Sequence, residues 1–297
     1  MQRSAVRADL LMLLTALIWG SGFVAQTAGM DHIGPLLFSG LRFMLGSLCL
    51  LPLVLWRSKR VPATQAFLSP ALLWGGSAMG LLLALGINLQ QIGLQFTSVT
   101  NAGFITGLYV IVVPVIGLML GSATGLGTWF GAALAVAGMF LLCVKDNFQV
   151  ASGDWFQLVG AFVWGSHVVV VGVFAGRHDA IRLAFIQFVV CAAVSLGLAA
   201  LLEPLELPGI VAAIPAVAYG GVVAVGIGYT LQVIAQKDAI ASHAAIIFSL
   251  EAVFAAVADA IFFDHQLNAR GYFGCLLMLA GMLVAQLWPS PRQAALR

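Results

Sequence analysis

The sequence predicts an all-α integral membrane protein with ten transmembrane helices, arranged as two inverted five-helix repeats. Three observations support this fold class. The 297-residue chain is 62% hydrophobic and only 8% charged, with a mean hydropathy of +1.06, whereas a soluble domain carries roughly 25% charged residues. Apolar runs of about 20 residues, the length needed to cross a bilayer, follow one another along the chain. The two halves of the sequence also resemble each other.

Charged or Pro/Gly-rich breaks separate ten apolar runs, and each run predicts one helix. The connections between the runs are short, and the longest polar one covers residues 57–69. The predicted spans are 9–28, 34–55, 70–91, 98–120, 127–144, 154–174, 180–202, 210–234, 242–263 and 270–288.

The positions of Lys and Arg predict that both termini lie in the cytoplasm, because positive charges concentrate in cytoplasmic loops. With the N-terminus inside, ten of the 13 Lys and Arg residues fall in cytoplasmic segments. Two others, Lys145 and Arg270, fall in outer loops, and Arg42 lies within a span. We therefore expect a plasma-membrane protein, in a bacterium the inner membrane, with its N- and C-termini in the cytoplasm.

An internal repeat divides the chain into residues 1–146 and 147–297. DLLMLLTALIWGS at 9–21 aligns with DWFQLVGAFVWGS at 154–166, an offset of 145. The same offset pairs Arg42 with Gln187 and Gly75-Gly76 with Gly220-Gly221, and after a three-residue slip an offset of 142 pairs Leu89-Gln90 with Leu231-Gln232 and Tyr109 with Glu251.

Five helices per repeat is an odd number, so the second repeat is expected to insert upside down relative to the first. Inverted repeats are related by a pseudo-two-fold axis in the membrane plane, and their binding sites lie near the bilayer midplane between the halves. The repeat therefore predicts a central cavity.

Several functional classes find little support in the sequence. Cys49, Cys143, Cys191 and Cys275 all lie inside apolar runs without ligand-like spacing, so we expect neither disulfides nor a metal site. No G-x-x-x-x-G-K-[ST] loop is present, so direct ATP drive within this chain is not expected. We expect no cofactor, and no nucleic-acid partner, because the positive charges sit in loops rather than along one face.

The motifs ALIWGSGFVAQ, GLRFMLGSLCLLPL, SLEAVFAAVADAIFFDHQL and GYFGCLLMLAGM resemble the drug/metabolite transporter superfamily of the EamA type. The resemblance covers essentially the whole chain. It implies ten helices in two inverted EamA repeats and the transport of small metabolites, often outward. It does not fix the substrate, because the family carries amino acids, their derivatives, amines and other compounds on one scaffold.

Two departures from the family pattern affect span nine. The usual Glu-Pro is replaced by Glu251-Ala252, and Phe263-Asp264 stands where a Gly-Glu pair often closes the helix. These changes weaken the expectation of a proline-dependent helix break there. Pro114 remains in the first repeat, where it removes one backbone hydrogen bond and predicts a break or kink in span four.

Charged residues within spans are candidates for function, since a carboxylate at mid-bilayer costs about 2.5–3.5 kcal/mol on insertion scales. Glu251 lies about nine residues into span nine, or roughly 14 Å deep. It is expected either to line the cavity, binding a substrate amine or a proton, or to be a buried structural acid. Asp259 is a second candidate for proton coupling, unless it reaches the outer interface. Arg42 is expected to bind a substrate carboxylate, bridge an acid or extend to the headgroups.

Aromatic and small residues complete the predicted cavity. Trp19 and Trp164 lie near mid-depth, away from the interfacial belt where Trp usually collects, and each is followed by Gly and Ser. Trp19, Ser21, Tyr109 and Trp164 are expected to line the cavity or, alternatively, to pack helices. His167 adds a titratable group that is a candidate for substrate or proton binding.

The sequence favours a secondary transporter, a permease or exporter of small metabolites that works by alternating access. An amino-acid-like substrate fits the Arg42 and Glu251 pair, and driving force would come from the substrate gradient, exchange or protons. The alternatives are a nucleotide-sugar or other drug/metabolite carrier and, more distantly, an intramembrane enzyme. Expected partners are the small-molecule substrate and the lipid bilayer, with a homodimer left open.

Overall fold

The computed structural model describes residues 2–58, 69–97, 99–121, 124–143, 151–262 and 268–288, and all regular structure in these ranges is helical. Eight helical segments are long and apolar enough to cross a bilayer, and two shorter apolar helices follow spans four and nine. These ten segments confirm the predicted all-α membrane fold. The helices are α1 (Gln2–Met30), α2 (Pro35–Ser58), α3 (Pro70–Leu94), α4 (Val99–Gly107), α5 (Tyr109–Met119), α6 (Leu126–Cys143), α7 (Ser152–Ala175), α8 (Ala180–Leu202), α9 (Leu207–Ala218), η1 (Tyr219–Tyr229), α10 (Thr230–Gln236), α11 (Ala241–Phe248), α12 (Glu251–Phe262) and α13 (Ala269–Leu287).

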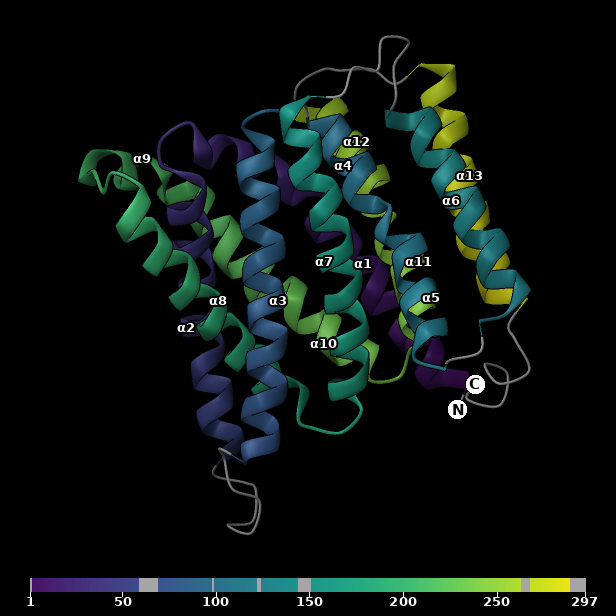
Figure 1. Ribbon diagram of the computed structural model, residues 1–297, viewed down its shortest axis with the longest axis horizontal. Coiled ribbons are helices and arrows are strands. Elements are labelled where there is room, and N and C mark those ends of the chain that lie inside the picture. Colours follow the sequence, from purple (N-terminus) through teal and green to yellow (C-terminus); the bar gives the residue numbers. More distant parts are fainter. Residues whose placement is uncertain are drawn as a thin grey trace.

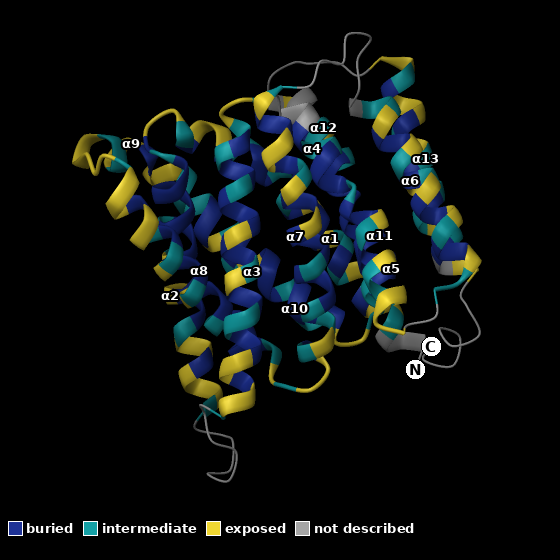
Figure 2. Cartoon of the chain, in the orientation of Figure 1, coloured by how far each residue is buried: buried dark blue, intermediate teal, exposed yellow. Residues whose placement is uncertain are grey.

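The outer surface of the bundle is apolar, as a lipid-facing surface must be. Large side chains such as Trp74, Leu201 and Ile261 are more than two-thirds exposed, and Figure 2 shows exposed residues on the outward faces of the helices around a buried centre. In water such a surface would be a large apolar patch. Burial of these side chains in a bilayer removes the unfavourable free energy of exposing them to water.

Contacts between the two halves of the chain occur in reciprocal pairs. Helix α1 packs against η1, α10 and α12, and its counterpart α7 packs against α3, α4 and α5. Likewise α2 packs against η1, and α8 packs against α3. The self-paired contacts are α2 with α8 and α6 with α13, the latter pair standing at one edge of the bundle in Figure 1. This is the contact pattern that a two-fold relation generates.

Spans four and nine are each interrupted near mid-depth, at equivalent positions. The amide of Leu108 donates to Ile105, and the amide of Leu250 donates to Ile247, both in the tight i→i+3 pattern. These two bonds are related by the offset of 142. The interruption in span four thus precedes Pro114 by more than one turn, and α5 continues through that proline.

A weak helix former lies at each interruption. It is Gly107 in span four and Ser249 in span nine, where the hydroxyl of Ser249 donates to the carbonyl of Ile246 at 2.8 Å. A Ser side chain that bonds a carbonyl in the preceding turn bends helices, and Gly is a poor helix former. Span nine therefore breaks without the proline that the family pattern usually has, directly before Glu251.

Span eight differs from its counterpart, span three. Helix α3 is a regular α-helix of 25 residues, whereas span eight contains the 11-residue π-helix η1 between α9 and α10. π-helical geometry is rare and is frequent at functional sites. Four glycines, Gly220, Gly221, Gly226 and Gly228, lie within this segment.

Polar contacts fix the ends of several helices. The carboxylate of Glu203 accepts from the amides of Leu36 and Leu37 at the start of α2, both at 2.8 Å. Arg57 lies 3.4 Å from Asp179, the N-cap of α8. Carboxylates at helix N-termini satisfy free amides and interact favourably with the helix dipole. These contacts hold the ends of α2 and α8 together.

Candidate substrate-binding site

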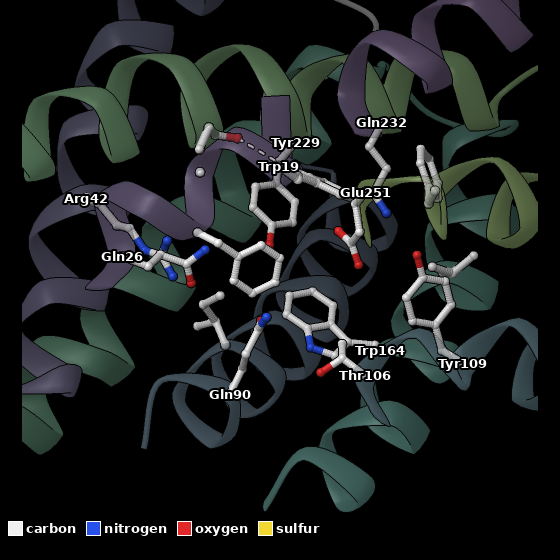
Figure 3. A pocket seen from close by; sticks show the side chains of 16 residues that line it. Trp19, Gln26, Arg42, Gln90, Thr106, Tyr109, Trp164, Tyr229, Gln232 and Glu251 are labelled. Carbon is white, nitrogen blue, oxygen red and sulfur yellow. Dashed lines mark hydrogen bonds between the residues drawn. The ribbon is translucent and has the colours of Figure 1, made fainter. Parts of the chain in front are cut away.

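A pocket lies between the two halves of the bundle, with about 580 Å³ of empty space including its mouth. Small-molecule sites in proteins are typically apolar concavities with a few polar groups. Sixteen residues from α1, α2, α3, α4, α5, α7, η1, α10, α11 and α12 line this pocket (Figure 3): Trp19, Gly22, Phe23, Gln26, Arg42, Ile87, Gln90, Thr106, Tyr109, Trp164, Val168, Ala224, Tyr229, Gln232, Phe248 and Glu251.

The lining repeats between the halves. Twelve of the sixteen residues form six pairs related by the sequence offsets 145 and 142. The pairs are Trp19/Trp164, Phe23/Val168, Ile87/Tyr229, Gln90/Gln232, Thr106/Phe248 and Tyr109/Glu251. The walls are therefore built largely from equivalent positions of the two repeats.

Aromatic rings form one wall of the pocket. The ring centroids of Trp19 and Tyr229 are 4.6 Å apart, those of Trp19 and Phe248 are 5.4 Å apart, and those of Trp164 and Tyr229 are 6.3 Å apart. These distances lie in or near the range of favourable aromatic pairs. Such a wall suits the apolar part of a small metabolite.

Arg42 lies at one end of the pocket, the end at which Gln26 also appears in Figure 3. Its side chain is only 3% exposed, and its guanidinium lies over the rings of Phe38 and Phe43, at 5.1 and 5.6 Å from their centroids. Its Nε and Nη2 atoms are buried and have no hydrogen-bond partner among the described residues. No described carboxylate lies within ion-pair distance of it. The guanidinium is thus available to an anion.

Glu251 lies at the other end, with Gln232 and Tyr109 nearby (Figure 3). It is the first residue of α12 and is 9% exposed. In the part of the chain that the structure describes, no Lys, Arg or His pairs with its carboxylate. The hydroxyl of Tyr109 and Oε1 of Gln232 are likewise buried without described partners. The acceptors at this end can receive a cation or a proton.

Of the seven residues predicted to line the cavity, five do so: Trp19, Arg42, Tyr109, Trp164 and Glu251. Ser21 and His167 do not. The hydroxyl of Ser21 lies 2.7 Å from that of Tyr219, because Ser21 is turned away from Trp19 on the helix. His167 is fully buried, and its Nε2 lies 3.1 Å from Oε1 of Gln187 on α8.

Pro114 and Asp259 are the other two predicted residues. Pro114 is buried within α5, outside the pocket lining, and the helix interruption expected there lies at Leu108 instead. Asp259 belongs to α12, but its side chain lies outside the described part of the structure. Its role in proton coupling stays a prediction.

Sequence reasoning did not select Tyr229, Gln26, Gln90, Gln232 and Thr106 as site residues. The repeat alignment did pair Gln90 with Gln232, and two polar residues at equivalent positions within spans were a usable signal. Tyr229 had no such signal, because its counterpart Ile87 is apolar. Gln26 has an apolar counterpart as well, Val171.

No group of three or more His, Cys, Asp and Glu side chains suited to a metal ion occurs among the described residues. The polar groups that reach the pocket are amides, hydroxyls, indoles, one guanidinium and one carboxylate. Such groups bind an organic solute through hydrogen bonds and charge. They do not resemble the oxygen, nitrogen or sulfur ligand clusters of metal centres.

The sequence matches the EamA-like transporter family over residues 6–144 and again over residues 151–286. The chain belongs to this family. This EamA-like protein is 29% identical to an uncharacterized transporter of Archaeoglobus fulgidus over 283 residues, which cover 94% of this chain and 86% of the relative. It is 27% identical to the uncharacterized inner membrane transporter YedA of Escherichia coli K12 over 177 residues, 55% of each chain.

A solved crystal structure shares the fold of this EamA-like protein. It has a TM-score of 0.76 and 20% sequence identity, and covers 95% of this chain and 97% of the other. The family and the transporter relatives establish the protein as a membrane transporter of the drug/metabolite transporter superfamily. A transporter requires a small-molecule substrate and a lipid bilayer.

Proposed function

We propose that this protein is a secondary transporter of small zwitterionic metabolites, in the class of amino acids and their relatives. The observation that carries the proposal is the pairing of one guanidinium and one carboxylate in a single aromatic-walled pocket, each without a charged partner among the described residues.

The two charges of the pocket are costly to bury without partners. Removing an ion from water into a protein interior costs several kcal/mol unless a partner compensates its charge. Arg42 and Glu251 have no described protein partners that do so. A substrate carboxylate at Arg42 and a substrate ammonium at Glu251 would compensate both charges at once, with charge-assisted hydrogen bonds. A neutral apolar solute would compensate neither.

We propose alternating access as the mechanism, with the two repeats rocking around the pocket. The reciprocal contacts of α1 and α7, and the six repeat-related pairs in the lining, support this arrangement. In inverted-repeat transporters the fixed site lies between the halves, and one half moves against the other. Interrupted helices at such sites are common, and both interruptions here lie directly before lining residues, Tyr109 and Glu251.

The direction and energy source are further parts of the proposal. We assign both termini to the cytoplasm because Arg57, Arg177 and Lys237 lie in segments at the end of the bundle where α1 begins (Figure 1). Net export from a bacterial cytoplasm, by exchange or with protons taken up at Glu251, fits this orientation.

A nucleotide-sugar carrier is less well supported, because phosphates favour several cations and Arg42 is the single Lys or Arg in the described pocket lining. An intramembrane hydrolase would need Ser166 and His167 to act together. Instead, Ser166 donates to the carbonyl of Phe162 while His167 contacts Gln187. No described geometry supports a nucleophile and base here.

The test is counterflow of radiolabelled amino acids into proteoliposomes that contain the purified full chain. Substitution of Arg42→Gln and Glu251→Gln should each lower the initial rate by 30-fold or more, taking roughly 2–5 kcal/mol for loss of one buried charged partner. The matched controls Arg177→Gln and Glu206→Gln change exposed residues and should leave the rate unchanged. Equal rates in all four variants would contradict the proposal, as would the absence of counterflow with any zwitterion.

A further inference from the structure

The two ends of the pocket are far apart, and this separation limits which zwitterions can use both. We infer that the substrate is a linear zwitterion whose ammonium and carboxylate are separated by an apolar spacer of several bonds, as in an ω-amino acid. A free α-amino acid carries both charges on one carbon. The inference rests on the proposed function and narrows its substrate class.

Helix α1 provides a measure of the separation. A Cβ atom at Gly20 would lie 2.6 Å from the carbonyl oxygen of Glu251, so Glu251 is level with Gly20. Arg42 and Gln26 both line the pocket and appear at the same end of it in Figure 3. The step from position 20 to position 26 is six residues, or about 9 Å along an α-helix. The level of the Glu251 backbone and the level of Gln26 are therefore about 1.7 helical turns apart along α1.

The π-helix η1 places the residues around Glu251 and Arg42 in the same order along the pocket. Gly228 lies against Trp19, whose Nε1 is 2.9 Å from a Cβ placed on that glycine. Gly220, eight residues earlier in η1, lies against Arg42, whose Cδ is 3.3 Å from its Cβ position. Two helices that cross the pocket thus place Trp19, beside the Glu251 end, well away from Arg42.

Aromatic rings occupy the interval between the two ends. The ring of Tyr229 lies between Arg42 and Glu251 in Figure 3. Its centroid is 4.6 Å from that of Trp19 and 5.6 Å from that of Phe43, and the ring of Phe43 lies under the guanidinium of Arg42. The spacer of a ligand that reaches both ends must run along these rings, so it is apolar or aromatic.

An α-amino acid is too short for this arrangement. Two bonds join its ammonium nitrogen to its carboxyl carbon, so these atoms are about 2.5 Å apart. When its ammonium binds Glu251 at a charge-assisted distance of about 2.8 Å, its carboxylate lies beside Trp19 and Tyr229, which offer no cation. A zwitterion with a longer spacer delivers the carboxylate to Nε and Nη2 of Arg42, the two buried donors without described partners.

Two isomers provide a controlled test. Leucine and 6-aminohexanoate have the same atoms and the same charges, but two and six bonds, respectively, separate nitrogen from the carboxyl carbon. Each is tested as an inhibitor and as a labelled substrate in proteoliposomes, and as a ligand that raises the Tm of the full chain in detergent. We expect 6-aminohexanoate to reach half-maximal inhibition at a concentration at least tenfold lower than leucine does. The value for 4-aminobutanoate should lie between the two.

Variants of Arg42 show whether the substrate binds at the Arg42 end of the pocket. Arg42→Gln should reduce the preference for 6-aminohexanoate over leucine to less than twofold, while Arg42→Lys, which retains a cation, should preserve most of it. The Tm of each variant without ligand reports whether it folds, so a loss of preference in a stably folded Arg42→Gln variant is informative.

The outcomes separate this inference from the proposed function. Leucine preferred to 6-aminohexanoate, or the two isomers equal, with transport still dependent on Arg42 and Glu251, overturns the inference and leaves the proposed function standing. Failure of every zwitterion in the series, in protein that is folded by its Tm, overturns the proposed function and this inference with it.

Discussion

The two halves of the protein build the pocket largely from equivalent positions, but they differ in the charged and titratable groups that they place at three pairs of positions. Arg42 in the first half corresponds to Gln187 in the second, Gly22 corresponds to His167, and Tyr109 corresponds to Glu251. In the second half, His167 contacts Gln187 at 3.1 Å, and neither residue lines the pocket. In the first half both Gly22 and Arg42 line it.

A small residue in the first half stands where the second half has an imidazole, and this exchange contributes to the polar character of the pocket. Where the second half fills the space with an imidazole, the first half has Gly22. A Cβ atom there would meet only the Cβ of Ala224, at 3.8 Å. Gly22 and Arg42 both line the pocket, whereas His167 and Gln187 contact each other outside its lining. The walls of the pocket are symmetric in position, and its charges are asymmetric because of these few exchanges.

The first prediction concerns a substitution that removes this difference between the two halves at Arg42. Arg42→Gln, which copies the second half, should lower transport by 30-fold or more through loss of about 2–5 kcal/mol of buried charge pairing. It should also leave the substrate-free Tm equal or higher, because it removes a buried guanidinium that has no described partner. Transport by counterflow and Tm in detergent measure the two effects.

The control for that prediction lies in the second half. Gln187→Leu removes the described partner of His167 and should destabilise the fold by about 1–3 kcal/mol, the cost of leaving a buried polar group unpaired. Transport by the folded fraction should be retained. If instead Arg42→Gln lowers the Tm while transport persists, Arg42 is a structural residue and the comparison fails.

The second prediction concerns a substitution that places an imidazole at position 22, as His167 does in the second half. Gly22→His should fill the pocket beside Arg42 and reduce transport by roughly tenfold or more, taking about 1–3 kcal/mol for forced overpacking as the scale. Gly22→Ala is the matched control, because a Cβ atom has room there, and it should keep near-normal transport. Equal transport in the two variants would mean that position 22 does not border the substrate.

The third prediction concerns a difference in packing. A Cβ atom at Gly20 would meet backbone atoms of α12, including the nitrogen of Ala255 at 2.8 Å. At Gly165, the equivalent residue, it would meet only side chains, the nearest being Val112 at 2.7 Å. Side chains can adjust and backbone atoms cannot do so without moving a helix. Gly20→Ala should therefore cost about 1–3 kcal/mol of stability, and Gly165→Ala about 1 kcal/mol or less.

Both costs are read from denaturant or thermal unfolding in detergent, with wild-type protein alongside. A larger loss in Gly165→Ala than in Gly20→Ala would show that the α1–α12 contact is looser than the α5–α7 contact, the reverse of the packing described above.

The sequence predicted the fold because bilayer crossing imposes length and hydropathy on every span. It predicted Arg42 and Glu251 as pocket residues for a related reason, since a charge within a span is costly and rarely faces lipid. The sequence did not predict the direction in which the side chains of Ser21 and His167 point around their helices. Ser21 lies two residues after Trp19, about 200° around an α-helix at 100° per residue, and His167 is turned toward α8.

Local backbone geometry was the second source of error. We expected a break or kink at Pro114 in span four, yet the interruptions lie at Leu108, after Gly107, and at Ser249 and Leu250. The π-helix that positions Tyr229 is not visible as a change in hydropathy, because η1 is as apolar as its neighbours. Packing of its glycines against α1 and α2 decides that geometry, and a single sequence does not specify such contacts.

The smallest predicted difference separates the two equivalent tryptophans. Nε1 of Trp19 donates to the carbonyl of Ala224 in η1 at 3.4 Å, whereas Nε1 of Trp164 is buried without a partner among the described residues. Trp19→Phe should therefore cost about 0.5–1 kcal/mol of stability, the low end of a hydrogen-bond contribution because the bond is long. Trp164→Phe should cost less in stability and more in substrate affinity, since its free N–H borders the pocket. Unfolding in detergent and ligand-induced shifts in Tm distinguish the two, and the reverse assignment would place the substrate against η1 instead of against α7.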